Sequence, residues 1–160
     1  MKVLKYTAAA ALLVPAFAGT AAAQGPTQSV SYEVQAINQI SLTGSPSLVI
    51  STATAGSAPT SASAGASYAI TTNGENKKIT AQIDSDMPAS VTLTVNLAAP
   101  SVGSSSNAVV LSTTPVDAVT GITRVSESGL SVGYQLSATV AAGVVQAGSR
   151  TVTYTITDGA

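Results

Sequence analysis

Few side chains in this sequence could carry out chemistry, because histidine and cysteine are both absent. Their absence removes the commonest general base, the commonest metal ligands and the thiol nucleophile. Lys77 or Lys78 could still activate a serine, but a lysine acts as a base only when it is desolvated. Both lysines follow Asn73-Gly74, a strong tight-turn signal, where solvated lysines are expected. We therefore expect no catalytic residues, no cofactor and no enzymatic activity.

Asp84 and Asp86 are the candidates for a metal site, with calcium as the metal. Hard cations bind several oxygen ligands, and alternate carboxylates on an irregular segment can supply two of them. No glycine-punctuated loop and no third nearby acid accompanies this pair in the sequence. We therefore interpret the segment as a polar turn before Pro88 and predict no metal site.

Charge is sparse along the whole chain, since Asp, Glu, Lys and Arg make up 8% of its residues. Without Lys2 and Lys5, four basic and seven acidic residues remain, which gives a formal charge of −3. Such a chain has no electrostatic footprint for binding nucleic acid. Its many Val and Ile residues, set in repeated alternation, are also the opposite of a disordered composition.

Residues 1–23 have the pattern of a secretory signal peptide. Lys2 and Lys5 give a positive start, a short apolar run follows, and small residues then offer a cleavage site. We expect cleavage at the end of this range, with cleavage after Ala18 or Ala21 as alternatives. The apolar run is too short to cross a bilayer comfortably, so we expect no membrane span in the processed protein.

The elements that follow are predicted from alternation of apolar and polar residues, which is typical of half-buried strands. The clearest case is the last strand, where threonines take one parity and apolar residues the other. The apolar residues of the first and last such segments are Val30, Tyr32, Val34, Ala36, Val152, Tyr154 and Ile156. We count seven to nine strands at sandwich-like spacing and no helical period after the signal peptide. Residues 24–160 are thus predicted to form a single all-β domain, an antiparallel, immunoglobulin-like β-sandwich.

Other parts of the pattern give finer expectations. The run Leu48-Val49-Ile50 is expected to be a short strand, and Thr52–Ser67 a long flexible surface loop of small residues. Glu127-Ser128-Gly129 is expected to be a turn before a long strand that starts at Leu130. The four tyrosines after the signal peptide lie on the apolar parity of strands, so we expect them in or beside the core.

In pattern, the whole chain after the signal peptide resembles bacterial secreted immunoglobulin-like proteins of the pilin-like and spore-coat-U-like kind. The features that carry this resemblance are the alternating N-terminal segment and the Ala-Gly punctuated return into Thr-Val-Thr-Tyr-Thr-Ile-Thr at residues 151–157. The resemblance implies an extracellular structural subunit that polymerises by lending a strand to a neighbour, with Val30–Ala36 as the donor candidate. Many such pilins carry a disulfide, which this chain lacks.

A second, local similarity concerns Val152–Asp158, which resembles the closing segment of cell-wall-binding WxL domains. Tyr154 and Ile156 would stand at the Trp and Leu positions, although the chain contains no tryptophan. This similarity implies binding to a cell-wall polymer.

Two functions therefore compete. The first is a secreted structural protein of the bacterial cell surface, a fimbrial or filament subunit whose partner is a second copy of itself. The second is a monomeric module that binds the cell wall or a carbohydrate of the cell envelope. Either would act outside the cell or on its surface, with the periplasm as an alternative location. For the last strand, we favour pairing within its own sandwich over accepting a strand from elsewhere.

Overall fold

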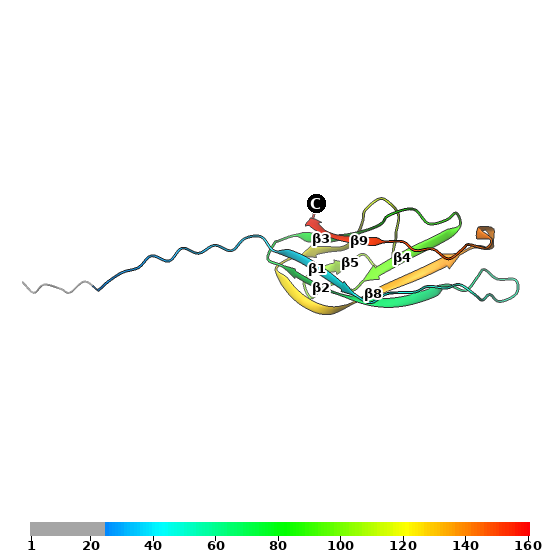
Figure 1. Cartoon of the computed structure of the whole chain (residues 1–160), viewed down its shortest axis with the longest axis horizontal. Coiled ribbons are helices and arrows are strands. Elements are labelled where there is room, and N and C mark those ends of the chain that lie inside the picture. Colours follow the sequence, from blue (N-terminus) through cyan, green and yellow to red (C-terminus); the bar gives the residue numbers. More distant parts are fainter. Residues whose placement is uncertain (1–24) are drawn as a thin grey trace, which may run out of the picture. The chain divides into compact units, whose positions relative to one another are not determined.

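A computed structural model describes residues 25–160, and the part of the chain from Asn38 onward forms two packed antiparallel sheets (Figure 1). The elements are β1 (Asn38–Thr43), β2 (Ala62–Thr72), β3 (Lys77–Ile83), β4 (Val91–Leu97), β5 (Ser104–Ser105), β6 (Val109–Val110), β7 (Val116–Ile122), β8 (Val125–Ala138), the 3₁₀ turn η1 (Val140–Ala142) and β9 (Val152–Asp158). One sheet has the order β1-β2-β8-β4-β6 and the other the order β5-β7-β3-β9. The prediction of an all-β sandwich with up to nine strands is confirmed.

The chain divides at Glu33 into an N-terminal unit and the sandwich, which comprises Val34–Ala160. The predicted signal peptide, residues 1–23, lies outside the described residues. Within residues 25–160, no helix is long and apolar enough to cross a membrane.

The core lies between the two sheets and follows the alternation of the strands. In β3, Ile79, Ala81 and Ile83 are buried while the residues between them are half-buried. The other sheet contributes buried residues in the same way, including Ile70 of β2 and Val132 of β8. Each strand therefore presents one apolar face to the core, as period-two patterning requires.

From β2 onward, successive strands belong to different sheets, so every connection crosses the sandwich. The Asn73-Gly74 turn is one of these crossings: it joins β2 to β3, which are not paired with each other. Strand partners are consequently distant in sequence, as when β2 pairs with β8 and β3 with β9.

The expected turn at Glu127-Ser128-Gly129 is wrong, because these residues lie inside β8. The pairing passes from Tyr68↔Leu130 to Ile70↔Glu127, so two residues of β8 face one residue of β2. Gly129 has a φ of 72°, the left-handed conformation that such a bulge places on glycine. The segment Glu127-Ser128-Gly129, which has the composition of a turn, therefore forms a bulge instead of a chain reversal.

The expected loop at Thr52–Ser67 is too long by six residues, since β2 begins at Ala62. Small residues of β2 pair with β8, with Ala64 opposite Tyr134 and Gly65 opposite Gly133. The composition conceals a strand here because the partner strand, and not local propensity, supplies the pairing.

The tyrosines divide into two groups. Tyr68 and Tyr134 are buried and Tyr154 is half-buried, as expected. The Tyr68 hydroxyl donates to the carbonyl oxygen of Ala98 at 2.6 Å, and the hydroxyls of Tyr134 and Tyr154 lie 2.7 Å apart. For Tyr32 the expectation of a core position is wrong, because its side chain is 95% exposed.

Alkaline pH is expected to destabilise the sandwich through these tyrosines. Burial, with a smaller effect from the Glu127 carboxylate, raises the pKa of Tyr68 to about 12. Burial also raises the pKa values of Tyr134 and Tyr154. The unfolded chain therefore loses its phenolic protons first, near the ordinary pKa of 10. The contribution of these tyrosines to stability should be constant below about pH 10 and fall as the pH rises toward 12.

Urea denaturation at a series of pH values from 8 to 12 measures this loss. Tyr68→Phe should make the decline above about pH 10 shallower, because one of the shifted groups is gone. A midpoint that stays constant through this window would contradict the assignment.

Candidate strand-pairing site

The two sheets have four edge strands, and these differ greatly in length. β5 and β6 have two residues each, whereas β1 has six and β9 has seven. β1 and β9 contact each other across the sheets, so the two long edges lie on the same side of the sandwich (Figure 1). Within residues 25–160, neither long edge has a strand on its outer side. Long open edges are where another strand can be added.

β9 is held firmly by β3 along its whole length. The register runs from Ile83↔Val152 to Lys77↔Asp158, and Tyr154 lies opposite Ala81. At the start of β9, the Asp84 amide donates to the Thr151 carbonyl oxygen at 3.1 Å, and the Asp84 carboxylate accepts from the Thr151 amide at 3.1 Å. The expectation that the last strand pairs within its own sandwich is confirmed.

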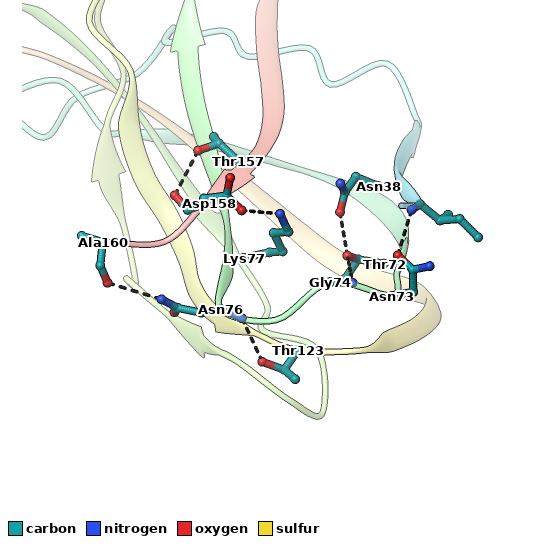
Figure 2. Close-up of polar contacts among 11 residues, drawn as sticks. Asn38, Thr72, Asn73, Gly74, Asn76, Lys77, Thr123, Thr157, Asp158 and Ala160 are labelled. Carbon is teal, nitrogen blue, oxygen red and sulfur yellow. Dashed lines mark hydrogen bonds and ion pairs between the residues drawn. The ribbon is translucent and has the colours of Figure 1, made fainter. Parts of the chain in front are cut away.

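The far end of β9 is fastened as well (Figure 2). The Lys77 ammonium forms an ion pair with the Asp158 carboxylate. The Gly159 amide donates to the Asn76 carbonyl oxygen at 2.6 Å, and the Asn76 side chain donates to the Ala160 carbonyl oxygen at 3.3 Å. Both ends of β9 are thus fixed by contacts with β3 and the residues that flank it.

The direction of the backbone groups in β9 follows from these contacts. The amide or carbonyl groups of Thr151 and Gly159 point toward β3. Antiparallel pairs alternate between hydrogen-bonded and non-hydrogen-bonded residues, so Thr153, Thr155 and Thr157 also point their backbone groups toward β3. The backbone groups of the residues between them, from Val152 to Ile156, therefore point toward the open edge.

The predicted interaction residues Val152, Tyr154 and Ile156 have a divided role. Their half-buried side chains pack against the core, and Tyr154 reaches Tyr134 of the opposite sheet. These residues contribute to the open edge of β9 through their backbone amide and carbonyl groups. On the other face Thr151, Thr153 and Thr155 are exposed, as the alternation predicts.

An apolar cleft of about 870 Å³ opens at the end of the sandwich where β8 ends and β9 begins. Its apolar lining includes Leu48, Ile50, Met87, Val91, Leu136 and Val145. The expected strand at Leu48-Val49-Ile50 is wrong, because this run has no strand pairing and lines the cleft instead. The two segments that border the cleft, residues 44–61 and 139–149, contain no charged residue. The segment that ends at Arg150 lines the cleft and leads into β9, so the cleft lies next to the start of β9.

The other predicted interaction residues, Val30, Tyr32, Val34 and Ala36, do not form a strand of the sandwich, which corrects that expectation. The first strand, β1, begins later, at Asn38. Val30, Tyr32 and Val34 are 79%, 95% and 80% exposed. Alternation identified a segment with one apolar face, but this fold does not bury that face.

The calcium candidates serve as hydrogen-bond acceptors. Asp84 binds the Thr151 amide, and the Asp86 carboxylate accepts from the Thr113 amide at 3.0 Å. In the part of the chain that the structure describes, no cluster of three or more acidic, histidine or cysteine side chains could hold a metal. Lys78 is paired with Asp117, with 3.0 Å between its ammonium nitrogen and the carboxylate oxygen.

Comparison with protein-family models, with curated proteins and with solved structures found no match to this chain.

Proposed function

We propose that this chain is a non-catalytic structural subunit of the bacterial cell surface that assembles into filaments by β-strand pairing between copies. Val30, Tyr32 and Val34 of one copy would lie along the open edge of β9 in the next. The observation that carries the proposal is this combination of an exposed alternating segment and a long open edge in a single chain. The signal-like start supports export of the protein.

The chemistry of the two surfaces is complementary. An added strand would pair with the outward backbone groups of β9 and place alternate side chains toward the core and the cleft. Burying each large apolar side chain contributes about 1.5–3 kcal/mol, so three of them offset part of the cost of association. The charged residue of the donor, Glu33, lies on the opposite parity from Val30, Tyr32 and Val34, and β9 contains no charge between Val152 and Thr157.

The positions of the two surfaces favour an open chain of subunits. The polypeptide enters the sandwich beside the β2–β3 corner, where Asn38 pairs with Thr72. The cleft lies at the opposite end, where Leu136 of β8 pairs with Ala62. The 14 residues of β8 separate these ends by roughly 40 Å. The donor leaves at one end, whereas the acceptor edge of β9 runs from the cleft along the sandwich. Donor and acceptor are thus different surfaces of the chain, and such a head-to-tail contact generates filaments when the rotation does not close a ring.

Size-exclusion chromatography with electron microscopy of residues 24–160 tests the proposal. We expect a ladder of oligomers that grows with protein concentration, and filaments in the micrographs. A monodisperse monomer at every concentration would overturn it. If that monomer also bound peptidoglycan or wall polysaccharide in a pull-down, the cell-wall module would be the correct function.

A further inference from the structure

The side chain of Asn73 holds the backbone just before β1 (Figure 2). Its amide oxygen accepts from the Ile37 amide at 2.8 Å, and its amide nitrogen donates to the Gln35 carbonyl oxygen at 2.8 Å. The Asn73 backbone amide donates to the Ile37 carbonyl oxygen at 3.2 Å. Three hydrogen bonds from a single residue thus fix the chain over Gln35–Ile37.

This arrangement extends the β1–β2 pairing beyond its last ladder pair. Asn38 lies opposite Thr72, so Ile37 faces Asn73 and the side chain of Asn73 takes the place of a further peptide group. Thr72 is buried and fixes the corner: its hydroxyl donates to the Asn38 side chain at 2.7 Å and accepts from the Gly74 amide at 3.1 Å. Gln35–Ile37 therefore continues the direction of β1 and is fixed to the corner formed by Thr72 and Asn73.

The direction of this line matters because the open edges of β1 and β9 lie on the same side of the sandwich. For the extension to pair with β9 of its own copy, the chain would have to reverse just before β1. A β-turn takes four residues, and its two central residues adopt specific dihedral angles that differ from those of a strand. Asn73 holds three of the residues that such a turn would use.

We infer that Asn73 is a positioning residue that prevents the extension from closing on its own β9 edge and so reserves it for a second copy of this chain. The inference rests on the proposed function and deepens it. Because Asn73 holds Gln35–Ile37, and with it Ala36, the donor segment ends at Val34. A strand joined to its site by a short flexible linker that spans the distance has a millimolar effective concentration. Without the contacts of Asn73, self-pairing would therefore prevail at micromolar protein.

Asn73→Ala tests the inference, with Asn38→Ala as the matched control in the same corner, because the Asn38 side chain accepts a hydrogen bond from the Thr72 hydroxyl. Size-exclusion chromatography at equal concentration gives the ratio of monomer to polymer. We expect Asn73→Ala to raise that ratio about tenfold or more. Asn38→Ala should leave it near the wild-type value. Equal ratios in Asn73→Ala and wild type would overturn the inference.

A second variant keeps the test independent of folding defects. A Gly-Ser-Gly-Ser insertion between Val34 and Gln35 preserves Asn73 and its contacts but gives the extension a flexible joint beyond them. It should also produce monomers in which the extension pairs with its own β9. These monomers should not bind a labelled synthetic peptide of residues 25–36, because their β9 edge is already occupied. Unchanged polymerisation of this variant would overturn the inference. A wild-type protein that neither polymerises nor binds the peptide would instead overturn the proposed function.

Discussion

Deleting residues 24–35 is expected to abolish polymers and leave a folded monomer. The deletion removes Val30, Tyr32 and Val34, whose side chains are exposed, and it leaves every strand from β1 to β9 intact. The far-ultraviolet circular dichroism spectrum should keep its β signature, and the melting temperature should change by a few degrees at most. Electron microscopy and size-exclusion chromatography measure the loss of polymers. Polymers that persist at wild-type abundance would rule out this segment as the donor.

A pair of single substitutions tests the face of the donor that matters. Tyr32→Asp places a charge on the apolar parity, where burial against a neighbour would cost several kcal/mol. We expect its polymerisation to fall about 100-fold or more, in line with a cost of roughly 3 kcal/mol. Ser31→Asp puts the same charge on the opposite parity, which would face solvent, and should polymerise nearly as the wild type does. Equal effects of the two substitutions would point to charge repulsion instead of burial.

Alternation predicted the faces of the strands well because a strand's side chains point by turns to opposite sides whatever it pairs with. The inner Val152, Tyr154 and Ile156 and the outer threonines of β9 are the clearest example. The partner of β9 was not predictable from this pattern. Every connection after β2 crosses the sandwich, so the neighbour of Tyr154 is Ala81, more than seventy positions earlier in the sequence.

Residues 30–36 show the limit of the same signal. They alternate as regularly as β9 does, yet the sandwich leaves them exposed. Alternation reports that a segment has an apolar face and says nothing of which molecule covers it. The cleft could not be predicted from the sequence either, because its lining comes from separate segments such as Leu48–Ile50 and the stretch around Val145.

Asn73 and Gly129 show how a local signal can be sound while its structural meaning stays open. Asn73-Gly74 does mark a sharp change of direction, but the Asn73 side chain also binds Gln35 and Ile37, and that contact cannot be read from a dipeptide. Gly129 has the positive φ that a turn would need, and the fold uses it for a bulge. Both outcomes depend on a partner strand that lies far away in the sequence.

Proline placed at neighbouring positions of β9 should separate folding from assembly. Thr153 directs its backbone amide toward β3, so Thr153→Pro removes a ladder hydrogen bond and leaves an acceptor in β3 without a partner. We expect it to destabilise the sandwich by about 2–4 kcal/mol. Val152 directs its amide toward the open edge, the side on which an edge strand tolerates proline. Val152→Pro should therefore change the stability by about 1 kcal/mol or less.

Assembly should respond to Val152→Pro even though folding does not, because the lost amide is one that an added strand would use. The net value of one such hydrogen bond corresponds to a rise of up to about tenfold in the protein concentration needed for polymerisation. Urea denaturation measures the stability of both variants, and sedimentation of polymers over a concentration series measures assembly. If Val152→Pro polymerised like the wild type, the outer edge of β9 would not be the acceptor. If Val152→Pro were instead the less stable of the two, the backbone of β9 would have the opposite phase, with its even-numbered residues bound to β3.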